Sequence, residues 1–392
     1  MSPLPALFLD RRRLSLASLW QIPRQFLSIP YSPGLRVTRR KRWNLWLSRY
    51  ETLALSERLR SFPTMLTVEA TNTCDLRCPG CHVGVGDAGR ERGSMPLDLY
   101  RALLRELGEY LFWIEFSSWG EPLLAENIHI MIRDAVRQGI STLVSTNLNT
   151  PLDNKSAERL VSSRAHIVHV AISGVRPETH AKYRVGGNLT TVVQNCLQIA
   201  EAKKRIGSQT PQLWWDYLAF DYNEDEIDSA RGLAEELGIQ FALRHGWVVG
   251  QDWTPRTPAL TARLPYSATP CPFLWQRALV NVDGGVGPCR GAFAAADDMG
   301  RVVASGATGS SSFREIWNGA AFREARKLFR SRNAGLNEAK RICTDCPIRI
   351  EFLDYVDHHR AGRPPESFES KRSVNETFNY FWNWNRRRLR DN

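Results

Sequence analysis

The chain has 392 residues, of which 43% are hydrophobic and 24% are charged, and its formal net charge is +11. It is longer than one ordinary domain, its composition is typical of a globular protein, and no apolar run reaches the roughly 18 residues of a transmembrane helix. The positive charge is concentrated at the ends: residues 1–60 carry twelve Arg and Lys against three Asp and Glu, and residues 371–392 carry six against two. The apolar start is too short for a signal peptide, so we expect a cytoplasmic protein, in which cysteines more often bind metal than pair as disulfides.

The first strand candidate, Leu66–Ala70, leads into a loop that contains three cysteines, Cys74, Cys78 and Cys81. The C-x3-C-x2-C spacing brings three thiolates close together, where they can hold three irons of a [4Fe–4S] cluster and leave the fourth iron without a protein ligand. An open coordination position is typical of a reactive metal site. From the loop alone, a zinc site or an incidental group of cysteines is the alternative.

Strand-like and helix-like segments alternate from residue 65 to residue 245. Five further strand candidates are short apolar runs, several rich in β-branched or aromatic residues: Trp113–Ser117, Thr142–Thr146, Ile167–Ser173, Leu213–Phe220 and Ile239–Leu243. Helix candidates with an apolar face or a glycine at the end lie between them: Pro96–Leu111, Asn127–Gln138, Leu189–Ile206 and Asp225–Leu237. Six such repeats with right-handed crossovers predict an α/β fold, a partial (β/α)6 TIM-like barrel with its chemistry at the C-terminal ends of the strands.

Polar segments follow the second to fifth strand candidates, and each has a functional and a plain interpretation. They contain seven residues that are candidate ligand contacts because of the family resemblance given below: Gly120, Glu121, Pro122, Asn147, Ser173, Arg184 and Asn223. A glycine lets the backbone approach a ligand closely, and an arginine offers a planar pair of donors to a carboxylate. The plain interpretations are a turn at residues 120–122, a strand end at Asn147, a solvated Arg184 and a helix N-cap by Asn223.

Four cysteines follow residue 250, where proline and glycine become frequent: Cys271, Cys289, Cys343 and Cys346. They could form a zinc ribbon, but a ribbon normally has a C-x2-C pair at both ends, and here only the last two cysteines have that spacing. The eighth cysteine, Cys196, lies on the apolar stripe of the long helix candidate. It is therefore expected in the core, with a hydrogen-atom donor to a substrate radical as the alternative.

The cysteine loop, the ordered polar segments and the late cysteines together resemble the radical S-adenosylmethionine (SAM) superfamily with a SPASM/twitch-type extension, over about residues 65 to 350. The resemblance implies that Cys74, Cys78 and Cys81 hold a [4Fe–4S] cluster whose open iron chelates SAM. It also implies that the seven candidate ligand contacts line the SAM. The chain departs from the family pattern at Trp119, where a glycine is usual, and at Gly80, where an aromatic residue often meets the adenine. His82 or Tyr183 is then a candidate neighbour of the base.

The same resemblance implies that the four late cysteines bind an auxiliary [4Fe–4S] cluster. Four cysteines instead of the seven of the full SPASM form indicate the shorter, one-cluster twitch form. Four thiolates occupy all four irons, so this cluster would conduct electrons and not bind substrate.

The implied activity is reductive cleavage of SAM to a 5′-deoxyadenosyl radical that abstracts a substrate hydrogen atom. The expected outcome is oxidation or modification of a small or lipid-linked metabolite, with electrons from a donor such as flavodoxin or ferredoxin. The alternatives are a peptide-modifying (RiPP maturase) radical SAM enzyme and a non-catalytic iron–sulfur electron-transfer protein. Arg244, His245 and Trp247 follow the sixth strand and are candidates to face the open barrel, with structural roles as the alternative.

Basic and aromatic residues interleave at 39–47 and 378–388. This composition favours either a membrane surface or lipid-linked substrate, with a peripheral position at the inner membrane as one expectation, or docking onto the body or a partner. Nucleic acid is the least favoured ligand.

The sequence as a whole predicts four regions: a basic, aromatic extension (1–60), a radical SAM core (61–250), an auxiliary cluster domain (251–350) and a basic aromatic tail (351–392).

Overall fold

The computed structural model describes residues 34–87, 89–246, 248, 250–257, 270–303, 312–332, 342–361 and 374–390. Residues 1–33 of the predicted N-terminal extension and the candidate residue Trp247 therefore lie outside the described residues.

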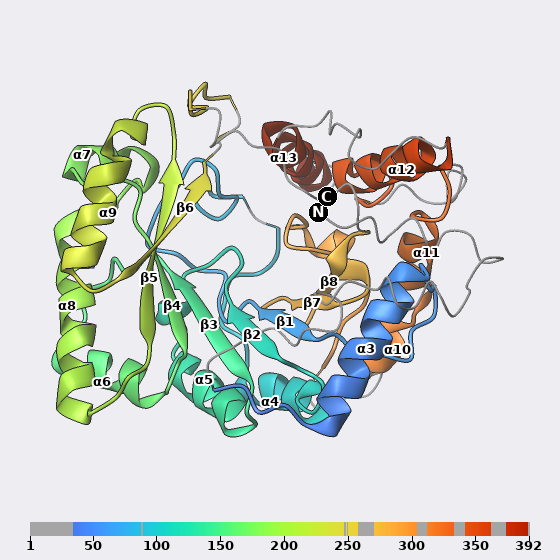
Figure 1. The fold of residues 1–392 in the computed structure, drawn as a ribbon, viewed down its shortest axis with the longest axis horizontal. Coiled ribbons are helices and arrows are strands. Elements are labelled where there is room, and N and C mark those ends of the chain that lie inside the picture. Colours follow the sequence, from blue (N-terminus) through green and yellow to red (C-terminus); the bar gives the residue numbers. More distant parts are fainter. Residues whose placement is uncertain are drawn as a thin grey trace.

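One eight-stranded sheet organises the molecule (Figure 1). Its strands are β1 (Met65–Val68), β2 (Trp113–Phe116), β3 (Ser141–Thr146), β4 (Ile167–Ala171), β5 (Gln212–Ala219), β6 (Gln240–His245), β7 (Arg277–Val280) and β8 (Val286–Gly287). The order is β6-β5-β4-β3-β2-β1-β7-β8, and every neighbouring pair is parallel except β7 and β8. The six predicted strands are confirmed, and they are parallel.

The side chains of each core strand alternate between the helices and the open side of the sheet. In β2, Ile114 and Phe116 are fully buried, whereas Glu115 between them is only half-buried on the other face. The helices of the core are α4 (Leu97–Leu107), α5 (Ile128–Arg137), α6 (Asn154–Ser162), α7 (Pro177–Tyr183), α8 (Leu189–Ile206) and α9 (Ile227–Glu236). Three short 3-10 segments, η2 (Pro122–Leu124), η3 (Glu224–Glu226) and η4 (Pro272–Leu274), lie in the loops.

Local sequence signals set the helix ends. The Asn188 side chain accepts a hydrogen bond from the Thr191 N–H at the start of α8, and Gly207, with φ +68°, ends it, so the helix has the predicted bounds. Helices α6 and α7 were not predicted. Asp153 caps the first of them and Pro177 is the first residue of the second, and both helices are short.

The C-terminal part continues the core sheet. Strand β7 pairs in parallel with β1, with Arg277 opposite Met65 and Val280 opposite Val68. Beyond it lie the 3-10 segment η5 (Ala295–Asp297) and the helices α10 (Phe313–Trp317), α11 (Ala320–Lys327), α12 (Pro347–Arg360) and α13 (Val374–Arg390). Helices α11 and α12 lie at the end of the molecule opposite α8 and α9, and α13 lies nearer the middle, between β6 and α12 (Figure 1). The predicted boundary at residue 250 thus separates strands of one sheet, and the boundary at residue 350 falls within α12.

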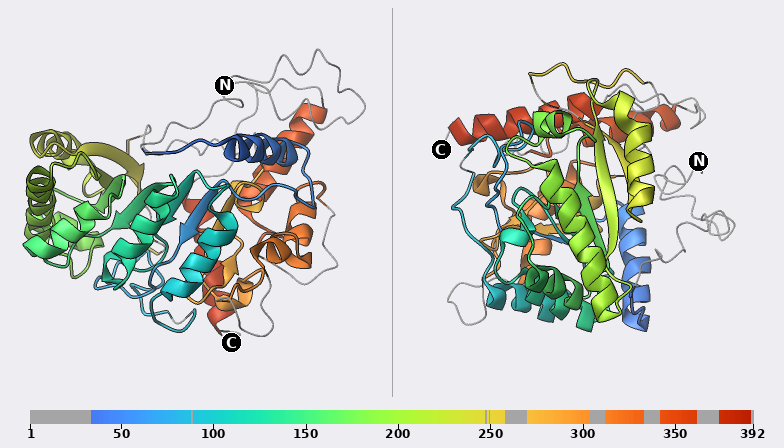
Figure 2. Two further views of the ribbon diagram at one scale, coloured as in Figure 1. Left: turned by 90° about the horizontal axis from the view of Figure 1, so that it is seen from below. Right: turned by 90° about the vertical axis from the view of Figure 1, so that its left-hand side faces the viewer.

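Helix α3 (Arg39–Leu53), from the predicted N-terminal extension, packs along the body (Figures 1 and 2). Asn44 exchanges two hydrogen bonds with the backbone of Phe62, at 2.9 and 2.8 Å, and the Ser48 hydroxyl donates to the Trp275 carbonyl. The opposite side of α3 carries exposed aromatic side chains, including Trp43 and Trp46, whose rings stack. Within the described residues no helix has the length and apolar character needed to cross a membrane.

Candidate functional site

The three cysteines of the first loop lie at the C-terminal end of β1, in a small apolar cluster with Leu76 and Tyr183. Several donors point at their sulfur atoms. The Leu76 N–H lies 3.4 Å from the Cys74 Sγ, and Asn147, Nδ2 donating, lies 3.6 Å from the same sulfur. Hydrogen bonds to sulfur stabilise bound thiolates and tune the potential of an iron–sulfur cluster.

Burial makes these cysteines depend on a cation for ionisation. It raises the pKa of Cys74 to about 12 and the pKa of Cys81 to about 11, so both thiols are neutral at physiological pH when no metal is bound. Iron binding would replace these protons. The loop therefore suits a positively charged iron–sulfur core better than it suits free thiolates.

The segment after β2 fits against the cysteine loop. A Cβ at Gly120 would lie 2.0 Å from the Thr71 carbonyl oxygen, so the close approach that requires glycine is to backbone of the cysteine loop. The Glu121 N–H donates to the Thr73 carbonyl, and the Glu121 carboxylate accepts from the Asn147 N–H and the Thr146 hydroxyl, each at 2.7 Å. Glu121 thus links the ends of β1, β2 and β3, and Pro122 begins η2 beside it.

Asn147 reaches the cysteine loop by its side chain. Its Nδ2 donates to Asp75 at 2.7 Å, and its Oδ1 accepts from the Asn149 N–H at 2.8 Å. Asn149 in turn donates from its side chain to Asp75 at 3.0 Å. The end of β3 and the residue after the first cysteine therefore form one polar unit.

Ser173 and Arg184 meet at the end of β4. The Arg184 Nε donates to the Ser173 hydroxyl at 3.2 Å, and its Nη1 lies 3.8 Å from the Cys78 sulfur. Asn223 is fully buried and donates to the carbonyls of Ser173 and Leu218, both at 3.0 Å. It occupies the N-cap position of η3 but makes no side-chain capping hydrogen bond there. The structure brings all seven candidate ligand contacts to this edge of the sheet, and the SAM contacts themselves stay a prediction.

Several buried polar atoms at this edge have no hydrogen-bond partner among the described residues, and they include Ser117 Oγ, Ser118 Oγ, Trp119 Nε1 and His180 Nε2. Burial and the charge of Arg184 lower the pKa of His180 to about 4, so the ring is neutral. Its Nδ1 accepts from the Ser173 N–H, which leaves the proton on Nε2. Buried donors are normally satisfied, so these atoms fit a polar ligand such as SAM.

The four late cysteines lie around one cavity of about 520 Å³ in the C-terminal part. Burial, together with the other cysteines of the set, raises the pKa of Cys289 to about 12 and also raises that of Cys343. Mutual effects of this kind require thiols that lie close together. Within the described residues, no group of His, Cys, Asp and Glu side chains has the arrangement of a single-ion site.

The same cavity extends to the first cysteine loop. Gly80 and His82 of that loop line it, together with Ser118 and Trp119 from the end of β2. The late cysteines and the two neighbours of Cys81, which lies 190 residues before Cys271, therefore line one chamber, and Cys74, Cys78 and Cys81 themselves are not among the residues that line it. Its charged lining consists of Arg244, Arg277 and Arg290, and no Asp or Glu is among the described residues that line it.

Three ionisable residues on the open face of the sheet were missed by the sequence analysis: Glu115, His169 and Asp216. Glu115 pairs with Arg290 at 2.9 Å, and Asp216 pairs with Arg244. His169 lies between them on β4, with its ring 5.8 Å from that of Trp214. The available signal was a single ionisable residue in the middle of an otherwise apolar strand.

The remaining predicted residues have plainer positions. Cys196 is 3% exposed in the main core, and it is absent from the residues that line the cavity. Tyr183 packs on Phe220, with ring centroids 4.9 Å apart. His82 lies between the rings of Phe293 and Trp382. His245 is the last residue of β6.

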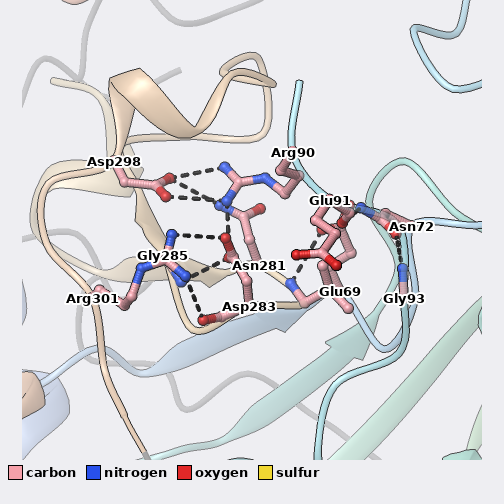
Figure 3. A network of polar contacts seen from close by, with 11 residues as sticks. Glu69, Asn72, Arg90, Glu91, Gly93, Asn281, Asp283, Gly285, Asp298 and Arg301 are labelled. Carbon is pink, nitrogen blue, oxygen red and sulfur yellow. Dashed lines mark hydrogen bonds and ion pairs between the residues drawn. The ribbon is translucent and has the colours of Figure 1, made fainter. Parts of the chain in front are cut away.

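A buried ion-pair network ties the segment after the first cysteines to the C-terminal hairpin (Figure 3). Arg90 is 3% exposed and binds Asp298 through both nitrogens of its fork, at 3.0 and 3.1 Å, and Asp283 at 2.9 Å. Arg301 also pairs with Asp283. The segment after the first cysteines and the β7–β8 hairpin are thus joined by ion pairs as well as by the pairing of β1 with β7.

Comparison with known proteins agrees with this geometry. Residues 68–211 match the radical SAM superfamily, and residues 271–347 match the SPASM iron–sulfur cluster-binding domain. A probable GTP 3′,8-cyclase from Methanocaldococcus jannaschii is 24% identical over 173 residues, which are 44% of this chain and 55% of that protein. The chain thus spans about half the length of the curated relatives it matches.

Among solved structures, Streptococcus suis SuiB bound to S-adenosylmethionine aligns with a TM-score of 0.56 at 14% identity, covering 86% of this chain and 84% of that one. SuiB bound to its precursor peptide SuiA aligns with a TM-score of 0.50 at 13% identity, covering 78% and 77%. At this identity the likeness concerns the fold. Superfamily members use SAM and a [4Fe–4S] cluster, and SPASM domains bind auxiliary iron–sulfur clusters. The chain belongs to the radical SAM superfamily and carries a C-terminal SPASM domain.

Proposed function

We propose that this protein is a radical enzyme whose reaction takes place in the chamber between its two cysteine sets. When bound, a cluster at Cys74, Cys78 and Cys81 with SAM supplies a 5′-deoxyadenosyl radical that takes a hydrogen atom from the substrate, and an auxiliary cluster supplies a one-electron acceptor. The observation that carries the proposal is the single cavity of about 520 Å³ that the four late cysteines share with the first cysteine loop. The auxiliary cluster would fill part of this volume, and the remainder suits a small molecule or one residue of a larger one.

The chain's own residues would hold and orient SAM. Ser173 and Arg184 present a hydroxyl and a guanidinium beside Cys78, and we assign them to the polar groups of SAM. Gly120, Glu121 and Pro122 fix the backbone after β2, and Asn147 orients the cysteine loop through Asp75. Asn223 would hold the backbone at Ser173 in place, because its side-chain amide donates to the carbonyls of Ser173 and Leu218.

We further propose one auxiliary cluster, at Cys271, Cys289, Cys343 and Cys346. The chain has eight cysteines in total, and four remain after the three of the first loop and the core residue Cys196 are assigned. Four thiolates saturate one [4Fe–4S] cluster. Reducing equivalents would come from a flavodoxin- or ferredoxin-like donor.

Anaerobic reconstitution followed by reduction in the presence of SAM tests the activity. The wild type is expected to release 5′-deoxyadenosine, and Cys78→Ala is expected to abolish the release. Cys346→Ala is expected to retain release without added substrate while losing the auxiliary cluster. A wild-type protein that holds reducible clusters and releases no 5′-deoxyadenosine would instead be an electron-transfer protein.

For the substrate, we place a peptide ahead of a small or lipid-linked metabolite. The fold likeness to SuiB covers most of the chain, and one SuiB structure contains a precursor peptide. The arginine-rich lining, with Arg277 outside every ion pair of the described residues, fits a group with a carboxylate or phosphate better than a neutral lipid chain. Deuterium transfer into 5′-deoxyadenosine from deuterated peptide and small-molecule fractions of the source cells separates the two classes. Transfer from the small-molecule fraction alone would contradict the peptide assignment.

A further inference from the structure

We propose that the C-terminal helix α13 is a wall of the reaction chamber and positions the first cluster loop by holding His82. The cofactors named here rest on the proposed function, but the contacts do not. The helix belongs to the basic aromatic tail whose role the sequence left open. Its described side chains include three that line the chamber: Phe381, Trp382 and Asn385.

His82 directly follows the third cysteine of the loop, and its ring is held on every side. Trp382 stacks on it with centroids 4.4 Å apart and planes 16° apart, and Phe293 stacks at 4.9 Å and 16°. Trp119 meets its edge at 5.0 Å. The ring is 1% exposed. A ring so enclosed fixes the backbone that carries Cys81.

Hydrogen bonds at both ring nitrogens fix the direction of the ring. His82 Nδ1 lies 2.7 Å from the Asp87 carboxylate, and Nε2 lies 3.0 Å from the Asn385 Nδ2. A carboxylate can only accept and an amide nitrogen can only donate, so His82 donates from Nδ1 and accepts at Nε2. Arg386, the next residue of α13, pairs with the same carboxylate at 3.2 Å.

The rest of Asn385 binds the auxiliary side of the chamber. Its second amide hydrogen donates to the Gly291 carbonyl at 2.8 Å, and its Oδ1 accepts from the Phe293 N–H at 3.1 Å. Asn385 is completely buried and uses both donors and its acceptor. One side chain of α13 thus joins a neighbour of Cys81 to the segment that follows Cys289.

Other contacts fix α13 on the same side. Tyr380 donates to the Ile342 carbonyl at 2.7 Å, directly before Cys343, and Trp384 donates to Asp297 at 2.9 Å. Gly291 lies so close to Phe381 that a Cβ there would be 2.5 Å from the ring. The helix therefore touches residues beside ligand candidates of both cysteine sets. That arrangement lets a single element set the position of one cluster relative to the other and exclude water from between them.

The test compares Trp382→Ala, the conservative Trp382→Phe and Asn385→Leu with a matched control, Trp43→Ala, whose indole is 63% exposed on α3. The first readout is amide hydrogen exchange of residues 78–87 in the reconstituted holoprotein. Trp382→Ala removes the ring stacked on His82, and Asn385→Leu removes the amide that donates to it. Each is expected to speed exchange of this segment by about tenfold, with iron content unchanged. Trp382→Phe is expected to restore slow exchange, and Trp43→Ala to leave it unaltered.

The second readout is the change in the electron paramagnetic resonance spectrum of the reduced protein on adding SAM. Trp382→Ala and Asn385→Leu are expected to alter this change, and Trp382→Phe to keep it. Wild-type exchange in both Trp382→Ala and Asn385→Leu would overturn the inference. If the wild type itself shows no SAM-dependent change, the proposed function fails, and the exchange measurement still decides the role of α13.

Discussion

At the residue scale, the contact that requires glycine at position 120 is with the backbone of the cysteine loop. A Cβ at this position would lie 2.0 Å from the Thr71 oxygen and 2.7 Å from the Thr71 carbonyl carbon, and neither backbone can move without disturbing the cysteine loop. We expect Gly120→Ala to destabilise the protein by about 2 kcal/mol and to reduce iron bound by the first cysteine set. Gly232→Ala is the control, because that position in α9 has open space around it.

Urea denaturation and iron analysis after reconstitution check this prediction. Iron is expected to fall from about eight to about four atoms per chain in Gly120→Ala and to stay at about eight in the control. Normal iron content and wild-type stability in Gly120→Ala would show that the loop tolerates the methyl group.

Glu69, at the end of β1, gives a prediction about pH. It is 1% exposed and accepts from the Val282 N–H at 3.2 Å, and its other oxygen has no hydrogen-bond partner among the described residues (Figure 3). Burial raises its pKa to about 7, against the opposing effects of that N–H and of Arg90. The folded protein therefore holds this proton more tightly than the unfolded chain. Protonated Glu69 thus adds to the free energy of unfolding below the pKa of the unfolded chain, and this stabilisation is lost as pH rises through 7.

We expect the wild-type free energy of unfolding to lose about 1 kcal/mol through Glu69 between pH 6 and pH 8. Glu69→Gln removes this titration, so its denaturation curves are expected to depend less on pH over that interval. Glu236→Gln, at an exposed position, is expected to behave as the wild type. An identical pH dependence in Glu69→Gln and the wild type would contradict the assignment.

Some residues of the site could be predicted from the sequence, and others could not. The cysteines were found because close spacing on a loop is a local signal. Glu115, His169 and Asp216 were missed because each is one polar residue in a different strand, and only the register of the sheet brings them together. The glycine at position 120 was singled out for a ligand contact, whereas the contact seen is with Thr71.

At the scale of elements, the Arg90 network joins the cysteine loop to the β7–β8 hairpin (Figure 3). Removing a buried partner leaves charges uncompensated, so Arg90→Ala is expected to cost about 3 to 5 kcal/mol, as Asp283 and Asp298 lose their shared cation. Arg101→Ala breaks a partly exposed pair with Asp134 and is expected to cost less than about 1 kcal/mol. Chemical denaturation of both variants measures the difference, and equal costs would contradict a structural role for the network.

Elements with a complete local signal were predicted well, and those that depend on a distant partner were not. Helix α8 has an apolar stripe, an Asn cap and a terminal glycine, and its bounds were correct. Strand β7 has only four residues and takes its place by pairing with β1, more than 200 residues earlier. Helix α13 was recognised only as a basic aromatic tail, because its contacts with His82 and Gly291 are tertiary.

At the scale of the whole molecule, the late cysteines and the first cysteine loop border one chamber but belong to different parts of the chain. Cys271→Ala is therefore expected to remove about four irons and leave the first cluster in place. Cys74→Ala is expected to have the converse effect. Iron analysis and Mössbauer spectroscopy of the two variants check this, and loss of all iron in Cys271→Ala would contradict independent sites.

The central claim is that the loop after β1 holds a cluster with one iron left for SAM. It is tested most directly by electron–nuclear double resonance on the reduced protein with SAM that carries a ¹³C- or ¹⁷O-labelled carboxylate. Cys271→Ala simplifies the spectrum by removing the auxiliary signal. We predict a coupling between the labelled carboxylate and the cluster spin, absent when unlabelled SAM is used. A reduced first cluster that shows no such coupling with saturating labelled SAM would contradict the account.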